Sequence, residues 1–547
     1  MKLRLNLLAY SALTAAALVA TTPVALAKEK TITVTESELR KMIAEEVRRQ
    51  TGSGAAAAPA NLEQRVSDLE ISQGSKITAL QTRADAVQWS FENGRPVIST
   101  GDGRFELAFR GRFHFDAGTF SQSPSNDVPY AYDGQNVRDL GSGSVFRRAQ
   151  FGVEGKFFRD FDYEMRFNFG GTETEDNSAL VNIMRVAYNP TPEIRINVGA
   201  IQPTFTLDDS TSSNDITFME RAAVVNAVIA EFGGSDARKG IEATYLKQGD
   251  NMDFMFNVAY TTSTTGGTTG TRQAVADDRD HLLGRFAARL FKNADWDVHV
   301  GANAATILSM GGVDTSSPTA LPAARNLNFR DRPELRIAGE RLVATGNIPA
   351  ESAWMWGLEA GVRYKNFYAS GEYFSWGVDR DRACIGCNVL APDPEFNGYY
   401  VMASYILTGE TKRYEAQNRS NSRMQFGAPR PNSPFSTGGT WGAWEIAARY
   451  SVLDLDYNVN PLGLATIVAP NANLGEIRGG QQSITSVDLN WYLNRNMRVM
   501  FSYQHVDVDR LSSTALSAAT NPTAPSAAYP NIGQQYDAFA IRTQFAF

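Results

Sequence analysis

The sequence predicts an all-β fold: a transmembrane antiparallel β-barrel of about 16 strands, preceded by a short N-terminal helical or coiled-coil segment. The clearest sign is the end of the chain, residues 538–547. Phe539, Ile541, Phe545 and Phe547 alternate there with small or polar residues, which gives one face suited to lipid and one suited to water. The second sign is an export signal, and the third is a composition rich in aromatic residues and glycine whose hydropathy is no higher than that of a water-soluble protein. A barrel hides its membrane segments in this way because only every second residue faces lipid.

Residues 1–27 have the features of a secretory signal peptide. Lys2 and Arg4 precede a largely apolar run, and Ala25 and Ala27 form a small-x-small cleavage site. We therefore expect a Gram-negative outer-membrane protein. The formal net charge is -7, and removal of a basic signal makes the chain more acidic still, which argues against nucleic acid as a partner.

Residues 28–88 are predicted to form a helical or coiled-coil leader in the periplasm. A capping-box pattern at 35–38 begins one helix, and a Gly/Ala/Pro-rich stretch at 52–59 ends it. A second helix carries Leu62, Val66, Leu69 and Leu80 near coiled-coil spacing. A short trimeric coiled coil, a lone amphipathic helix and disorder all stay open, and the leader offers a contact to peptidoglycan.

Residues 89–547 are predicted to form the barrel. From Arg104 the period changes to two: Phe105, Leu107 and Phe109 face one way, while Arg110 and Arg112 face the other. Charged residues at every second position suit a water-filled lumen.

Long and short connections alternate along the barrel region. A very long loop spans 201–238, and further long loops lie near 118–144, 263–280, 309–352, 379–395, 458–481 and 509–534. Pairing each long loop with a short turn places both ends of the barrel in the periplasm. Residues 409–440 are too long for a periplasmic turn and leave a count of about 18 strands open.

Several segments of the chain resemble the phosphate-selective porin O/P family. They lie, in order, at 213–221 (SNDITFMER), 329–336 (FRDRPELR), 397–400 with 407–410, 442–445 and 490–494. The resemblance implies a homotrimer of 16-stranded barrels, a third long loop folded into the lumen, and passive uptake of small anions such as phosphate or other oxyanions. One departure is that residues 200–215 contain no Lys or Arg but carry Asp208, Asp209 and Asp215, which puts phosphate itself in doubt.

Basic residues outnumber acidic ones among the positions that the alternation turns inward. An arginine-rich ring in a narrow pore concentrates anions, and the guanidinium fork suits oxyanions. The pore-lining, anion-binding candidates are Arg110, Arg112, Arg104, Arg148, Lys156 and Arg166. Pairing of the charges across a merely wet lumen is the main alternative, which would give a general, weakly selective porin; a cation preference also stays open.

Other chemistry has little support in the sequence. Cys384 and Cys387 form a C-x-x-C in a predicted outer loop, where we expect a disulfide formed during export, with free thiols or a metal as alternatives. The four histidines are scattered and flank no nucleophile motif, so we expect no enzyme, no cofactor and no resident metal. A structural barrel that anchors the cell wall through the leader is a further alternative to a channel.

Overall fold

The computed structural model describes residues 41, 66–67, 70–76, 78, 86–92, 94–122, 140–171, 180–235, 237–265, 279–311, 325–382, 390–417, 422–459, 474–513 and 531–547. The chain forms two compact units, Met1–Gln81 and Thr82–Phe547. The described residues of the first unit are helical. Leu62, Leu69 and Leu80 lie outside the described residues, so the trimeric coiled coil and the domain boundary at 88 stay predictions.

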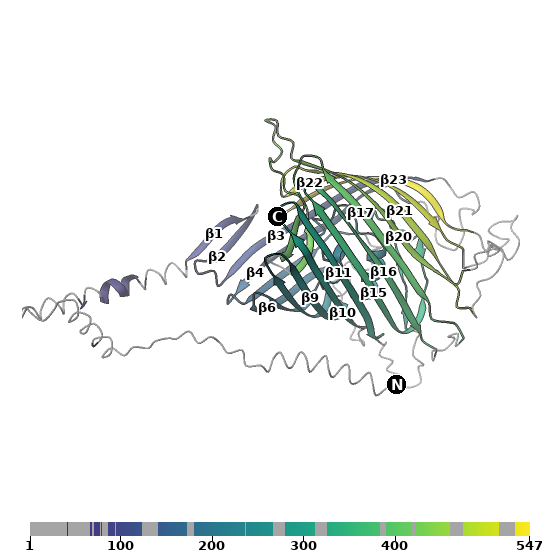
Figure 1. Cartoon of the computed structure of the whole chain (residues 1–547), viewed down its shortest axis with the longest axis horizontal. Helices are drawn as coiled ribbons and strands as arrows, with labels where there is room; N and C mark the ends of the chain where they lie inside the picture. Colours follow the sequence, from purple (N-terminus) through teal and green to yellow (C-terminus); the bar gives the residue numbers. More distant parts are fainter. Residues whose placement is uncertain are drawn as a thin grey trace, which may run out of the picture. The chain divides into compact units, whose positions relative to one another are not determined.

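The second unit is a closed antiparallel barrel of 16 strands (Figure 1). Its strands are β3 (Glu106–Gln122), β4 (Gly143–Phe157), β5 (Phe161–Asn168), β6 (Val181–Thr191), β7 (Ile194–Ile201), β8 (Arg238–Gln248), β9 (Asp253–Thr264), β10 (Asp280–Lys292), β11 (Trp296–Ser309), β15 (Ile348–Tyr364), β16 (Phe367–Arg380), β17 (Glu395–Ile406), β20 (Ala443–Tyr457), β21 (Ile477–Tyr492), β22 (Met497–Asp509) and β23 (Gln534–Ala546). Each strand pairs with the next, and β23 closes the barrel on β3. The predicted count of about 16 strands is therefore confirmed, and the alternative of about 18 is not.

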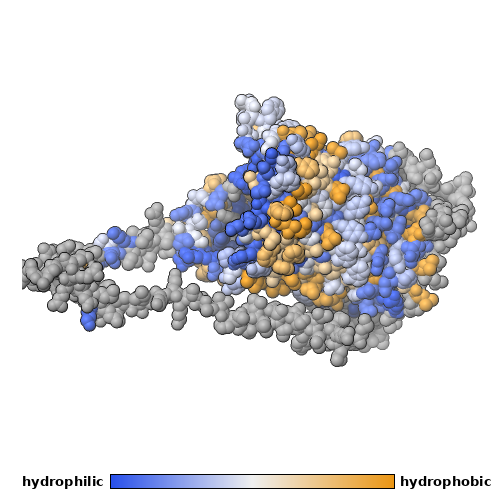
Figure 2. Space-filling view, viewed as in Figure 1, coloured by the Kyte–Doolittle hydropathy of each residue, from blue (hydrophilic) through white to orange (hydrophobic). Residues whose placement is uncertain are grey.

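Side chains alternate between lumen and outer wall as the sequence predicted. On β23, Ala538, Ala540 and Arg542 are buried toward the lumen, while Phe539 and Phe545 are exposed on the outside. Hydrophobic side chains gather over the strands on the face of the barrel seen in Figure 2. Among the described residues, no helix is both long and apolar enough to cross a membrane.

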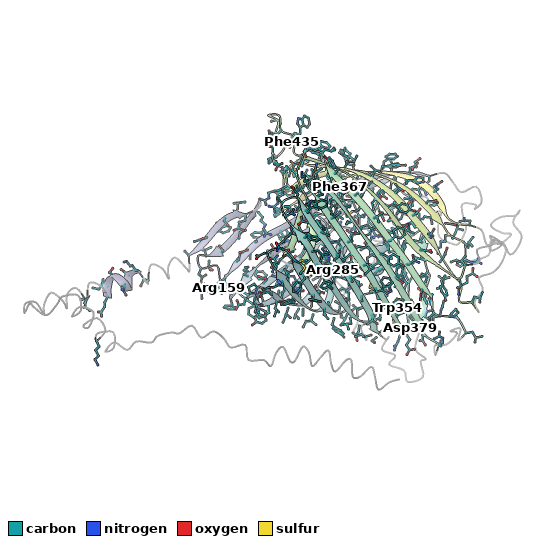
Figure 3. The ribbon with its side chains drawn as sticks, in the orientation of Figure 1. Arg159, Arg285, Trp354, Phe367, Asp379 and Phe435 are labelled. Carbon is teal, nitrogen blue, oxygen red and sulfur yellow. The ribbon has the colours of Figure 1, made fainter. Side chains whose placement is uncertain are left out.

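Aromatic pairs lie on the outer wall at two heights. Pairs near the short turns are Trp296–Tyr364, Phe161–Tyr188 and Trp444–Trp491, and pairs close to the middle of the strands are Trp356–Tyr373, Tyr399–Tyr450 and Tyr503–Phe539. Figure 3 marks the two ends with Phe367 near the short turns and Trp354 near the long loops. Aromatic girdles on an apolar outer wall are typical of an outer-membrane barrel.

A hairpin that the sequence did not predict joins the barrel at its seam. It consists of β1 (Val87–Glu92) and β2 (Arg95–Thr100), and β2 pairs with the start of β3. Just above it, the backbone of Phe547 bonds with Gly111 in both directions. A Cβ at Gly111 would lie 2.4 Å from the Phe547 ring, so this aromatic chain end needs a glycine beneath it.

Three connections fold into the lumen. The inward loop (202–237) carries α4 (Leu207–Ser210) and α5 (Ala223–Glu231). The second inward loop (described at 310–311 and 325–347) carries the short strands β12 (Asn326–Leu327), β13 (Arg330–Asp331) and β14 (Val343–Ala344). The periplasmic connection 407–442 forms the lumen hairpin, β18 (Arg413–Gln417) with β19 (Ser422–Gly427), which contacts α4, β9 and β10. This hairpin accounts for the length of the connection that left 18 strands open.

An apolar core occupies part of the lumen. It joins α5 and the second inward loop to inward residues of the wall, and includes Val224, Val228, Phe329, Leu335 and Trp376. The space left for solutes is therefore much narrower than the barrel.

Candidate anion pathway through the lumen

A small cavity of about 40 Å³ lies between the wall and the inward loop. Ser212, Ser213 and Gln202 of the inward loop line it, together with one carboxylate, that of Glu164. Its six arginines are Arg110, Arg112, Arg148, Arg166, Arg221 and Arg423. We refer to this cavity as the constriction.

The strand pair β3–β4 positions three of these arginines. Arg110 donates to Glu154 at 2.7 Å and to Glu164 at 2.8 Å, so two carboxylates offset its charge. Arg112 lies two residues further along β3 but donates to hydroxyls of the inward loop, at 2.6 Å to Ser213 and 3.2 Å to Ser212. These two hydroxyl acceptors are neutral, and the two-pronged geometry is the one that an oxyanion would use.

The inward loop is fastened to the wall on both sides of the constriction. The Glu372 carboxylate accepts from the backbone N–H groups of Leu207 at 2.7 Å and Asp208 at 2.9 Å. Further along, Glu220 accepts from Arg147 at 2.8 Å and from Arg542 at 2.6 Å. Burial alone would raise the pKa of Glu220, but the nearby arginines outweigh it and hold that pKa well below its usual range.

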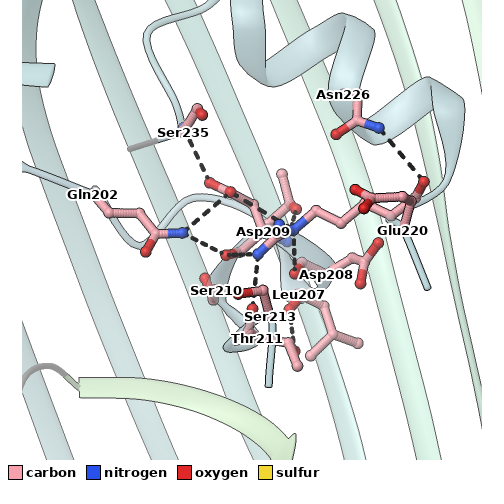
Figure 4. A network of polar contacts seen from close by, with 12 residues as sticks. Gln202, Leu207, Asp208, Asp209, Ser210, Thr211, Ser213, Glu220, Asn226 and Ser235 are labelled. Atoms are coloured by element: carbon pink, nitrogen blue, oxygen red, sulfur yellow. Dashed lines mark hydrogen bonds and ion pairs between the residues drawn. The ribbon is translucent and has the colours of Figure 1, made fainter. Parts of the chain in front are cut away.

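The acidic residues that put phosphate in doubt do not line the constriction. Asp209 is buried and is contacted by Gln202 and by the backbone N–H of Ser235 (Figure 4). Arg221 donates to the carbonyl oxygens of Asp208, Asp209 and Thr211, which folds this part of the loop around a guanidinium. The loop thus supplies a positive charge from just beyond the acidic segment.

The lumen hairpin supplies Arg423. This side chain donates to the Ser210 carbonyl and, at 3.3 Å, to the Gln202 side chain. The hairpin is in turn held by Arg285 on β10, which donates to the Arg423 carbonyl at 2.7 Å while paired with Glu359 at 2.7 Å. Figure 3 labels Arg285 between the two ends of the strands, and its side chain is fully buried.

A larger cavity of about 270 Å³ leads from the constriction to the periplasmic side. It shares Arg110 and Ser212 with the constriction, and we call it the vestibule. Its other basic residues are Arg95, Arg413, Arg430, Arg495 and Arg498, and its one acidic residue is Asp215. Burial and the neighbouring Arg413 and Arg495 lower the pKa of Arg430.

Elsewhere on the wall, inward charges are paired. Arg363 pairs with Asp297, Arg449 with Glu334, and Arg542 with Asp116. The alternative that charges cancel across the lumen thus describes this part of the wall, whereas the constriction and vestibule keep an excess of arginine.

The structure brings together four of the six predicted pore-lining residues: Arg110, Arg112, Arg148 and Arg166. Lys156 lies on β4 but near its periplasmic end, where its side chain is exposed. Arg104 lies outside β3, which begins two residues later. Arg104 lies in the preceding turn, 47% exposed and paired with Asp102, whose pKa is lowered to about 2 by hydrogen bonds from Thr100 and the Arg104 backbone.

The sequence reasoning missed the arginines that loops bring in. Arg221 and Arg423 belong to segments without period-two alternation, so no local pattern assigned them to the lumen. The sign of these residues in the sequence was the unusual length of the two connections that carry them, 201–238 and 409–440. Cys384 and Cys387 lie outside the described residues, so their disulfide stays a prediction.

The barrel, its aromatic girdles and its arginine-lined lumen define an outer-membrane porin of Gram-negative bacteria. The family "Phosphate-selective porin O and P" matches residues 108–547, and the chain belongs to that family.

Two relatives in sequence have been found. The chain is 22% identical over 434 residues to Porin O of Pseudomonas aeruginosa, covering 76% of this chain and 86% of that protein. It is 27% identical over 372 residues to an uncharacterised protein of Caulobacter vibrioides, covering 66% of this chain and 64% of the relative. The chain thus spans less than two thirds of the Caulobacter protein.

Solved porins show a general likeness only. An anion-selective porin from Comamonas acidovorans aligns with a TM-score of 0.42 and 11% identity, over 81% of this chain and all of that one (100%). The channel DcaP of Acinetobacter baumannii aligns with a TM-score of 0.40 and 10% identity, over 82% and 99%.

Proposed function

We propose that this porin lets small anions diffuse passively into the periplasm through the constriction and the vestibule. The observation that carries the proposal is the constriction itself, a cavity of about 40 Å³ lined by six arginines and one carboxylate, with Glu154, Glu220 and Asp209 as further counter-charges behind the arginines. At this width an ion must shed part of its water shell, and the arginine N–H groups replace it. Among the described residues that line the cavity, a cation would meet oxygen ligands only from Glu164, Gln202 and the two serines, and six arginines would repel it.

Oxyanions such as phosphate are the proposed solute class. Arg112 already holds two hydroxyl oxygens with its two outer nitrogens, and an oxyanion presents two oxygens in the same way. The carboxylates of Glu154 and Glu164 beside Arg110 moderate the field, so that a bound anion can leave toward the vestibule. Membership of a family described as phosphate-selective supports this choice.

A homotrimer with a periplasmic leader is the proposed assembly. The leader's coiled-coil spacing supports trimerisation, and the leader could also reach peptidoglycan. The proposed role is that of a channel and not of an enzyme. A general, weakly selective porin is the second candidate, favoured by the paired charges on the rest of the wall.

The test is a planar-bilayer recording of the purified full-length protein in a potassium chloride gradient, with and without phosphate. We expect a reversal potential on the anion side and a concentration-dependent block of chloride current by phosphate. A cation-side potential, or currents that phosphate leaves unchanged, would reject the proposal. A potential near zero would favour the general porin.

A further inference from the structure

Residues 329–336 of the second inward loop contact the inward loop at α5. Phe329 and Leu335 of this segment are fully buried in the apolar core beside α5. The same residues form one of the sequence motifs noted above, and the arginine-lined pathway gives them no role. We call this segment the clamp.

Glu334 is the polar centre of the clamp and is 1% exposed. One carboxylate oxygen accepts from the Ala223 backbone N–H, in the first turn of α5, at 2.8 Å and from the Ser451 hydroxyl at 2.6 Å. The other accepts from the Arg449 guanidinium. One carboxylate therefore joins the second inward loop to α5 and to β20.

A second carboxylate repeats the contact. Asp331 accepts from the Asn226 side chain on α5 at 3.2 Å and pairs with Arg336 at 2.9 Å. Two acidic residues of the clamp thus hold two positions on the same helix. Removal of a buried carboxylate destabilises the protein, because the groups that donated to it lose their acceptor in a site that water does not reach.

We infer that the clamp confines conduction to the arginine-lined side of the lumen, with Glu334 as its positioning residue. While the clamp holds α5 against the wall, the apolar core leaves no path on that side among the described residues. Release of α5 opens a route past paired wall charges such as Arg449, where anions gain no preference. The clamp therefore sets selectivity without touching the permeating ion.

The principal test is Glu334→Gln, which keeps the shape of the side chain but gives up the charge and one acceptor. We expect higher single-channel conductance, a reversal potential closer to zero and weaker block by phosphate. Asp331→Asn should change all three in the same direction but less, because it alters one side-chain contact to α5. Glu351→Gln is the matched control, since Glu351 is an exposed carboxylate at the outer end of β15.

A structural readout accompanies the currents. In a Cys384→Ser, Cys387→Ser background, Ala223→Cys places a thiol where the native side chain is 2% exposed. We expect no reaction with a water-soluble maleimide while Glu334 is present, and labelling once Glu334→Gln is added. This measurement needs only an assembled barrel, recognised by its heat-modifiable migration, and Asp331→Asn serves in its place if the Glu334 variant does not assemble.

The inference rests on the proposed anion pathway, but the two fail differently. A wild-type channel without anion preference would reject the proposed function. An anion-selective wild type would reject the clamp alone if Glu334→Gln leaves three things unchanged: the conductance, the reversal potential, and the protection of the thiol introduced by Ala223→Cys.

Discussion

Two sides of one lumen differ in what their inward charges face. On the side of β3 and β4, Arg112 and Arg148 line a cavity bounded by hydroxyl-bearing loop residues, and Arg148 lies 3.8 Å from the Glu220 carboxylate. On the side of β10, β15 and β20, Arg285, Arg363 and Arg449 are each paired with a carboxylate, and an apolar core fills part of the lumen. The strands of both sides follow the same alternation. The folded-in loops, and not the strand pattern, therefore decide which arginines reach a solute.

The largest expected effect comes from reversing charges at the constriction. Arg112→Glu with Arg423→Glu should move the reversal potential to the cation side and weaken phosphate block by about tenfold or more, because each charged hydrogen bond contributes about 1.5–3 kcal/mol. Arg363→Gln on the opposite side is the control and should leave selectivity unchanged. If both variants shift the reversal potential equally, the two sides of the lumen do not differ in their effect on selectivity.

Removing a carboxylate beside the constriction arginines should strengthen phosphate block instead of weakening it. Glu164→Gln takes away a carboxylate 2.8 Å from Arg110 and 3.2 Å from Arg185. We expect phosphate to bind about fivefold more tightly, equivalent to ~1 kcal/mol of screened interaction, and to leave more slowly. Titration of the block at fixed voltage measures this, and unchanged affinity would mean that Arg110 does not contact the anion.

The vestibule should matter mainly at low salt. Neutralising Arg413, Arg430 and Arg495 to Gln removes charges that attract anions over about 10 Å at 0.1 M salt. Conductance should fall at 0.1 M and match wild type at 1 M, where the attraction is screened. A loss of the same proportion at both salt concentrations would point to a steric role.

The smallest effect is expected from acid. Because the pKa of Glu220 is depressed in the folded protein, its contribution to loop anchoring is complete above the unfolded value and is lost only as pH falls through the lower folded value. The difference in conductance and in heat-modifiable migration between wild type and Glu220→Gln should therefore stay constant from pH 7 down to about 4.3, the ordinary glutamate pKa. A transition above that pH would show that the arginines do not hold Glu220 ionised.

The comparison of the two sides also shows which features of the lumen could be predicted from the sequence. Period-two alternation placed Arg110, Arg112, Arg148 and Arg166 in the lumen, because strand geometry alone decides which face a side chain takes. Alternation could not tell that Arg110 meets two carboxylates while Arg112 meets two serines, since those partners lie 44 or more residues away.

The period-two alternation could not predict where strands end or which loops fold into the lumen. Arg104 continues the alternation of β3, yet a turn held by Asp102 keeps it out of the strand. Arg221 and Arg423 reach the constriction through tertiary folding of irregular segments, for which no local period exists. The sequence did not predict the hairpin β1–β2, because this hairpin is not one of the 16 strands of the closed barrel. Within the described part of the barrel, it pairs only with the start of β3.

Paired charged reagents test the central claim most directly. In the background without native cysteines, Ser213→Cys places a thiol in the constriction and Ala223→Cys places one in the filled side. We expect an anionic methanethiosulfonate to modify the constriction thiol much faster than a cationic one of similar size, with the thiol in the filled side protected from both. Any enhancement of thiol reactivity by Arg112 affects both reagents, so it cancels in their ratio. Faster modification of the constriction thiol by the cationic reagent, or equal reaction at the two positions, would contradict an anion pathway confined to the arginine-lined side.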